Sequence, residues 1–150
     1  MTWATFETAA PELAADGRRL MFRGGPSGKV LLATVRGDEP PRIHPISVDI
    51  VGGRLYAFIL SGPKRRDLES DGRYAMHTHL DLEKPHEFSI RGRAWIVEDP
   101  ERRREVAGRW VFEPEDDYGL FEFDVSTAVF GSRPDADAWP PSYTSWRATA

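Results

Sequence analysis

The 150-residue sequence contains no cysteine, which excludes disulfides, thiolate zinc sites and a cysteine nucleophile. It also has no excess of positive charge, because its formal net charge is -4 at pH 7. Any phosphate binding therefore has to come from a local basic cluster, and we expect no nucleic-acid-binding face. No stretch approaches the roughly 18 consecutive apolar residues of a membrane span, and the N-terminus lacks a secretion signal. These absences predict a soluble, cytoplasmic protein that binds neither membrane nor nucleic acid.

Signature motifs of several enzyme classes are missing as well. The sequence has no nucleophile elbow, Walker loop or dinucleotide fingerprint. His77 and His79 share one face of a predicted strand and could ligate a metal or a haem. No cysteine or carboxylate accompanies them at metal-ligand spacing, so packing is the favoured interpretation and no metal site is predicted.

The sequence begins with a predicted helical segment at about residues 2–23. Most of the remaining sequence has the pattern of short strands. Thr2 is expected to cap the first helix of that segment, and Pro11 to begin the second, which would bury an apolar side. Helices are also predicted over 64–70 and 100–110. Alternating or β-branched apolar residues predict the following strands: 30–35, 43–51, 55–60, 74–80, 88–97, 120–130 and 143–147.

Local irregularities are predicted at four positions. Pro45 lies inside a strand and indicates an edge position or a bulge. Gly92 indicates a bulge or a close backbone approach, and Gly52-Gly53 suits a hairpin turn with positive φ. Turns this short cannot join parallel strands. We therefore expect one mainly β domain over residues 1–150, an antiparallel barrel with peripheral helices.

A basic triplet, Lys64-Arg65-Arg66, follows Ser61-Gly62-Pro63 where the third strand ends and a short helix begins. Free N–H groups at a helix N-terminus and adjacent cationic side chains favour an anion. On a helix Arg66 points away from Lys64, so at least one of the three is expected to face solvent. Taken alone, such a triplet is more often solvated surface than a binding site.

The order and spacing of several segments resemble the flavin-binding split β-barrels of the pyridoxamine 5'-phosphate oxidase-like family. The resemblance covers about two-thirds of the chain, chiefly residues 29–97. The matching segments are Leu31–Val35, Pro41–Ser47, Gly53–Tyr56, Lys64–Leu68 with Asp71–Ala75, Ile90–Ala94 with Val97–Pro100, Leu120–Val125 and Thr144–Arg147.

This resemblance implies an FMN-binding type of split β-barrel that forms a homodimer, with a flavin in each of two grooves between the subunits. It implies an FMN-dependent oxidoreductase that acts on a small-molecule substrate. The alternatives are a reductase dependent on the deazaflavin F-420 and a non-catalytic flavin- or haem-binding carrier or sensor. No side chain is assigned as a general acid or base.

The resemblance also implies which residues bind the cofactor. Arg42 and Lys64 are implied to bind the cofactor phosphate, and Arg65 is implied to assist them. The residues implied to line the flavin ring are Ile46, Ser47, Tyr56, Phe58 and Ile59.

Two positions depart from the oxidases of that family. Ser47 stands where they carry a lysine five residues after the strand arginine, and Gly62-Pro63-Lys64 replaces Ser-Arg-Lys. Each departure removes one phosphate donor. The C-terminal arginine and histidine that hold pyridoxal phosphate have no match, so oxidation of pyridoxamine phosphate is not expected.

Overall fold

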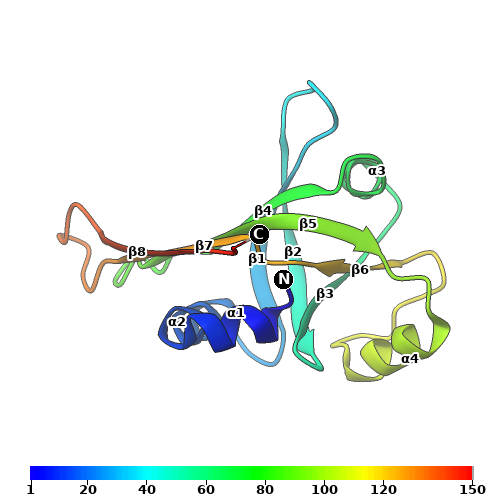
Figure 1. Ribbon diagram of the computed structural model, residues 1–150, viewed down its shortest axis with the longest axis horizontal. Coiled ribbons are helices and arrows are strands. Elements are labelled where there is room, and N and C mark those ends of the chain that lie inside the picture. Colours follow the sequence, from blue (N-terminus) through cyan, green and yellow to red (C-terminus); the bar gives the residue numbers. More distant parts are fainter. Residues whose placement is uncertain (150) are drawn as a thin grey trace.

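The computed structural model describes residues 1–149 as an antiparallel split β-barrel with helices at its periphery (Figure 1), which confirms the predicted fold class. The elements are α1 (Trp3–Ala9), α2 (Pro11–Met21), β1 (Gly28–Thr34), β2 (Arg42–Val51), β3 (Arg54–Ile59), α3 (Pro63–Ser70), β4 (Arg73–Thr78), β5 (Glu87–Ile96), α4 (Pro100–Arg109), β6 (Gly119–Phe123), β7 (Thr127–Ser132) and β8 (Ser142–Arg147).

Six of the described strands close the barrel in the order β1-β2-β3-β6-β5-β4, and β4 pairs back to β1. The long strand β5 has two partners on one side, because its first half pairs with β7 and its last residues, Ala94–Ile96, pair with β6. β8 pairs with β7, so these two strands extend the sheet beyond the barrel as the arm at the left of Figure 1.

The single strand predicted over residues 120–130 is wrong, because the chain forms β6 and β7 there. Between them, Asp124 passes so close to β5 that a Cβ on Gly92 would lie 2.4 Å from the Asp124 carbonyl oxygen. The predicted close backbone approach at Gly92 is thereby confirmed. The predicted hairpin turn is confirmed too, with φ of 57° at Gly52 and 75° at Gly53.

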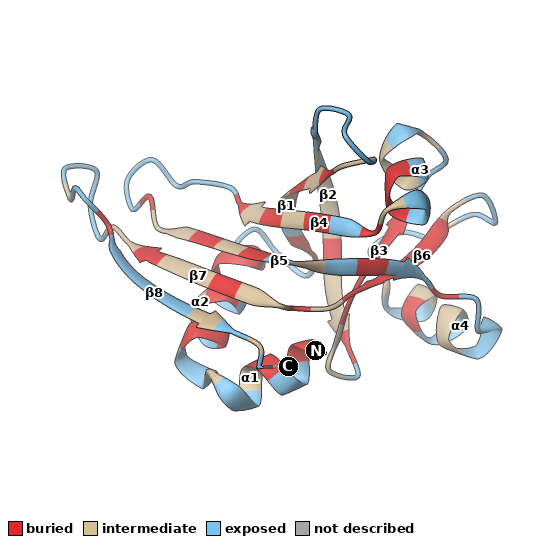
Figure 2. Ribbon diagram, turned by 45° about the horizontal axis from the view of Figure 1, so that its top comes forward, coloured by how far each residue is buried: buried red, intermediate tan, exposed pale blue. Residues whose placement is uncertain are grey.

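The barrel interior holds the main core, and the N-terminal helices close one side of it (Figure 2). The side chain of Thr2 caps α1 by accepting from the N–H of Thr5 at 3.1 Å. Leu13, Leu20 and Met21 of α2 are buried, as the sequence predicts. No helix within residues 1–149 is long and apolar enough to cross a membrane.

β3 is buried on both faces. Leu55, Ala57 and Ile59 point into the main core, whereas Tyr56 and Phe58 belong to a second apolar cluster beneath α4. This strand can therefore present little side-chain surface to a ligand.

Candidate functional site

The barrel opens where β2 and β3 separate. β2 pairs with β1 from Arg42 to Val48, but β3 pairs only with the last three residues of β2, Asp49–Val51. β3 then continues along β6. The half of β2 from Arg42 to Val48 thus has a strand on one side and, within residues 1–149, none on the other. We call this side of β2 the free edge; its backbone polar groups are available to a ligand. The predicted edge position of Pro45 is confirmed.

Four of the predicted ring-lining residues flank this opening, whereas Tyr56 still pairs with Asp49 and its side chain lies in the cluster beneath α4. The side chains of the four differ in direction. Continuing the β2–β3 register would place Ser47 opposite Phe58 and Ile46 opposite Ile59, where the strands have already separated. Ile59 points into the core, and Phe58 packs edge-on against Trp110 with ring centroids 5.1 Å apart. β3 consequently offers a ring its backbone rather than its side chains.

Arg42, a predicted phosphate ligand, binds a carboxylate of the protein itself. Its Nε donates to Asp67 Oδ2 at 2.9 Å, and the Asp67 side chain is 1% exposed. Thr34 Oγ1 donates to the same oxygen at 2.8 Å, and Arg36 Nε donates to Oδ1 at 3.1 Å. These four residues, named here the Asp67 cluster, fasten α3 to β1 and β2.

The carboxylate of this cluster stays charged at neutral pH. Burial would raise the pKa of Asp67, but hydrogen bonds from Thr34, Arg42 and Arg36 outweigh burial and hold the pKa below its usual value. Two guanidinium groups face this one carboxylate, and Arg42 has a second, more exposed counter-ion in Glu39 at 3.6 Å.

The three basic residues at the start of α3 have different environments. Lys64 is half-buried and, among the residues described, makes no ion pair. Arg65 donates to Glu69 at 2.6 Å and to the carbonyl oxygen of Asp117 at 2.8 Å. Arg66 is exposed, as expected for at least one of the three. Lys64 is therefore the predicted cation whose charge is uncommitted.

His44 lies beside these residues, although no motif points to it. It follows Arg42 by two positions and so shares its face of β2, while Lys64 lies one turn before Asp67 on α3. The Arg42–Asp67 ion pair therefore brings His44 and Lys64 to neighbouring positions. His44 Nε2 is buried without a hydrogen-bond partner in the described chain. Burial, then Lys64 and Arg42, lower the pKa of His44, and Asp67 opposes them.

Ser47 has a cationic neighbour from another strand. Lys29 lies directly opposite on β1, and its Nζ donates to Ser47 Oγ at 2.7 Å. Lys29 thus places an ammonium group beside position 47, which itself carries no lysine. Ser47 keeps its own hydroxyl proton free to donate.

An apolar cavity of about 230 Å³ lies on the outer face of the barrel, across β2, β1, β4 and β5. Ile43 at this cavity is 67% exposed. His77 Nδ1 lies 2.6 Å from the carbonyl oxygen of Thr78, which can only accept, so the proton is on Nδ1 and Nε2 has a free lone pair. The cavity is lined by Leu31, Ala33, Ile43, Ala75, Met76, His77, Ser89 and Arg91.

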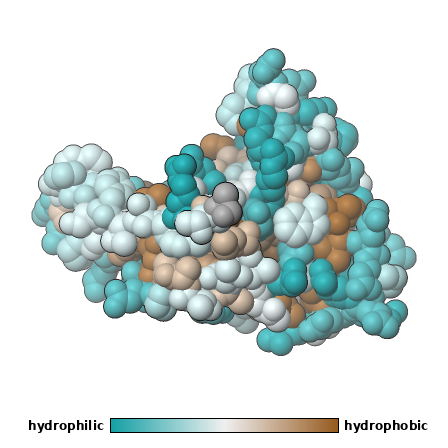
Figure 3. All heavy atoms as spheres, in the orientation of Figure 1, coloured by the Kyte–Doolittle hydropathy of each residue, from teal (hydrophilic) through white to brown (hydrophobic). Residues whose placement is uncertain are grey.

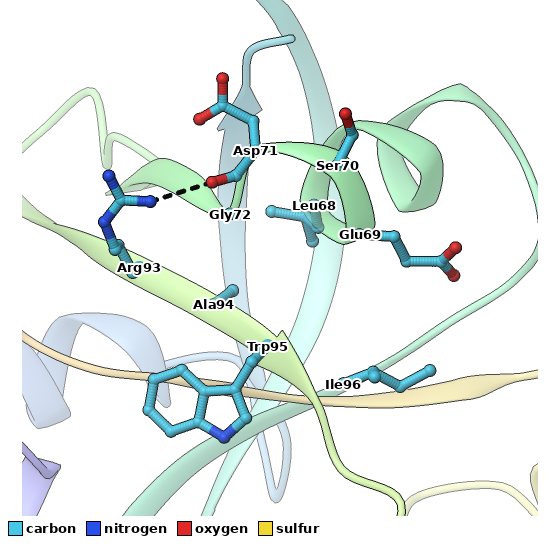
Figure 4. A pocket seen from close by; sticks show the side chains of 9 residues that line it. All are labelled: Leu68, Glu69, Ser70, Asp71, Gly72, Arg93, Ala94, Trp95 and Ile96. Carbon is cyan, nitrogen blue, oxygen red and sulfur yellow. Dashed lines mark hydrogen bonds between the residues drawn. The ribbon is translucent and has the colours of Figure 1, made fainter.

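A second hollow, of about 380 Å³, lies between the end of α3 and β5 (Figure 4). Arg93 spans one end, donating to the carbonyl oxygen of Asp71 at 3.0 Å, and Trp95 and Ile96 are partly exposed there. None of the predicted cofactor-binding residues lines it. No group of three His, Asp or Glu side chains among residues 1–149 is placed to hold a metal ion.

Sequence reasoning missed three contributors to the site: Asp67, His44 and Lys29. Asp67 could have been predicted, because its spacing of three from Lys64 places both residues on one helix face. The sequence gives a weaker indication for His44, which shares a strand face with Arg42. No sequence pattern indicates Lys29, because its pairing with Ser47 depends on the β1–β2 register.

No family model and no curated protein sequence matches the chain. Solved structures do match. A NimC/NimA family protein from Clostridium acetobutylicum aligns with a TM-score of 0.62 and 17% identity, over 87% of this chain and 92% of that one. A putative pyridoxamine 5'-phosphate oxidase from Listeria innocua aligns with a TM-score of 0.56 and 19% identity, over 75% and 94%.

A third match is HutZ, the heme storage protein of Vibrio cholerae, with a TM-score of 0.58 and 14% identity over 78% of this chain and 89% of that one. At these identities the matches establish the fold alone. The chain thus has the same split-barrel fold as proteins described as a putative pyridoxamine 5'-phosphate oxidase and as a heme storage protein.

Proposed function

We propose that this chain binds a flavin-type cofactor at the opening between β2 and β3 and acts as an oxidoreductase. FMN is the proposed cofactor, and F-420 is the alternative. The observation that carries the proposal is the uncommitted charge of Lys64 beside the free edge of β2. The match to a putative pyridoxamine 5'-phosphate oxidase supports it at the level of fold.

The residues present fit a phosphate-bearing flavin. Arg36 and Arg42 share the Asp67 carboxylate, and Glu39 offsets the second of these charges. Lys64 adds a charge without an ion pair in the described chain, and the buried Nε2 of His44 lacks an acceptor. An anion supplies what these groups lack. The free edge of β2, near Ile46 and Ser47, offers backbone donors and acceptors of the kind that fix a planar heterocycle.

In this proposal the cofactor supplies the redox chemistry, and the protein binds and orients it. Lys64 neutralises the phosphate. Arg42 holds Asp67, and through it α3, against β2. Ser47 presents its hydroxyl next to Lys29, which adds a cation near the ring for an anionic group of a small-molecule substrate.

We also propose a homodimer in which a second copy covers the outer-face cavity. The cavity lining is mostly apolar, and Ile43 there is two-thirds exposed. Elsewhere the surface includes strongly hydrophilic regions, such as the projecting β1–β2 loop at the top (Figure 3). Burial of such an apolar face against a second copy would be favourable. Light scattering after gel filtration measures the mass directly, and a monomer would contradict the dimer.

The absorbance spectrum of the purified protein, followed by titration with FMN and F-420, tests the cofactor. Lys64→Gln is expected to weaken FMN binding about tenfold, because it removes a charge-assisted hydrogen bond. Arg66→Gln is the matched control, since Arg66 is an exposed cation on the same helix. Binding of neither cofactor, or an unchanged affinity in Lys64→Gln, would overturn the proposal.

A haem-binding carrier is the second candidate, favoured by the environment of His77. A histidine whose Nδ1–H is held by a backbone carbonyl presents Nε2 as a ligand, and here the adjacent cavity is apolar. The match to HutZ supports this candidate at the level of fold. Haemin titration with wild type and His77→Ala tests it. Sustained turnover of an acceptor by flavin-loaded protein would instead exclude a purely binding role.

A further inference from the structure

We propose that His44 is a ligand of the cofactor phosphate and that it takes up a proton when the phosphate binds. This inference rests on the proposed function, because it concerns the same site. It gives a role to a partly buried histidine, with a buried Nε2, that no sequence motif singles out.

The position of His44 follows from the Arg42–Asp67 ion pair. His44 follows Arg42 by two residues on β2, and Lys64 precedes Asp67 by one turn on α3. Both side chains can donate a hydrogen bond, and neither has an acceptor among the described residues. Asp67 cannot serve both, because its oxygens already accept from Thr34, Arg36 and Arg42.

An unpaired buried nitrogen costs free energy, so this arrangement favours any ligand that brings an acceptor. The charges facing His44 are Lys64 and Asp67 from α3 and Arg42 from β2, with Arg36 completing the Asp67 cluster. Glu39, from the loop before β2, lies 3.6 Å from Arg42. Three cations and two carboxylates leave one positive charge, which the charge of about -2 on a phosphate monoester more than compensates.

Access to His44 requires a side-chain movement. Its Nε2 is enclosed by the surrounding protein. Lys64 is half-buried and, in the described chain, is held by no ion pair. The Lys64 ammonium lies near enough to His44 to lower its pKa, and it is free to move with an arriving phosphate.

Protonation then follows from electrostatics. Without ligand, burial and the nearby cations lower the pKa of His44, so the imidazole is mostly neutral near pH 7. A bound phosphate reverses the local charge and raises this pKa. The contribution of His44 to FMN affinity is therefore largest at the acidic end of the neutral range and is lost as pH rises.

The test compares FMN with riboflavin, which lacks the phosphate, in four proteins. His44→Ala removes the donor, His44→Gln keeps a donor that cannot titrate, and His79→Gln changes an exposed histidine as the matched control. Dissociation constants are measured by flavin fluorescence from about pH 6.5 to 8.5, a range that begins at the usual histidine pKa and extends above it. Thermal unfolding is recorded for each protein.

We expect His44→Ala to weaken FMN binding about tenfold and to leave riboflavin binding unchanged. His44→Gln should lose less affinity and should flatten the pH dependence relative to wild type, while His79→Gln should match wild type. The phosphate's own ionisation is common to all four proteins, so the difference between them isolates His44.

Three outcomes would overturn the inference. Equal weakening of FMN and riboflavin in His44→Ala would show a structural role. Unchanged affinities for both flavins in His44→Ala, while Lys64→Gln still weakens FMN binding, would remove His44 from the site and leave the proposed function intact. Binding of neither flavin by wild type would overturn both.

Discussion

Two buried carboxylates fasten two helices to this barrel, and the surroundings of the two differ. Asp67 ties α3 to β1 and β2, as described above. Glu122 of β6 ties β3 and α4, with Oε1 2.6 Å from Arg54 and Oε2 3.6 Å from Arg102. Both carboxylate side chains are at most 3% exposed.

The Glu122 cluster, meaning Glu122 with Arg54 and Arg102, borders a closed apolar layer. Tyr56, Phe58, Val106 and Leu120 fill the space beneath α4. Burial and the nearby Glu122 raise the pKa of Tyr56, so its hydroxyl stays protonated. The Asp67 cluster instead adjoins a strand edge without a partner and two uncommitted donors. The same device therefore serves packing at one end of the barrel and, in our proposal, ligand binding at the other.

The largest expected effect is on the closed side. Phe58→Ala should lower the free energy of unfolding by about 4 kcal/mol, because it leaves a cavity beneath α4. FMN affinity of the folded fraction should not change, since the Phe58 side chain points away from the opening. Urea denaturation and flavin titration measure the two quantities. A loss of affinity together with stability would contradict the division between the two regions.

The second largest effect is expected for a substitution of Asp67, which should reduce both stability and FMN binding. Asp67→Asn is expected to cost about 3 kcal/mol of stability, because it leaves Arg36 and Arg42 without their shared buried carboxylate. FMN affinity should fall as well, because α3 loses its tie to β2. Glu122→Gln is the control, with a comparable loss of stability and unchanged affinity. If both variants bind FMN equally poorly, the comparison fails.

Acid provides a gentler probe of the same cluster. Because the folded-state pKa of Asp67 is depressed, its stabilising contribution is complete above its unfolded pKa of about 3.9 and is lost as pH falls through the folded value. Wild-type stability should therefore decline more steeply below about pH 4 than that of Asp67→Asn. Parallel acid unfolding curves would show that Asp67 does not titrate on unfolding.

The smallest effect should come from the opening itself. Lys29→Ala removes an exposed cross-strand partner of Ser47 and should change stability by less than about 0.5 kcal/mol. If Lys29 serves an anionic substrate, KM for an anionic acceptor should rise while that for a neutral acceptor stays constant. Equal changes for both acceptors would remove Lys29 from the substrate site.

Much of the fold could be predicted because its signals are local. Thr2 and Pro11 mark helix starts, Gly52-Gly53 a hairpin, and Gly92 a close approach. The error at residues 120–130 arose because alternation continues across the junction of β6 and β7. The first half of β5 pairs with β7 and its last residues pair with β6. Contacts between residues far apart in the chain decide this division.

The site could be predicted only in part for the same reason. Lys64 follows from a strand end and a helix start, both visible locally. The commitment of Arg42 to Asp67 was not visible, because it joins residues 25 positions apart. The continuous apolar run of β3 is typical of a strand buried on both faces, which is where the structure places the side chain of Phe58.

Pro45 also affects how readily the free edge of β2 can pair with a strand of another molecule. An unpaired strand edge invites strands from other molecules and so promotes aggregation. The β1–β2 ladder runs without interruption through Leu31 and Pro45, so the donor that proline lacks is missing on the open side. A small planar molecule is less affected by that gap than an incoming strand, which needs a regular series of donors. Pro45 therefore makes the free edge of β2 a poorer template for an incoming strand, and it hinders the proposed ligand less.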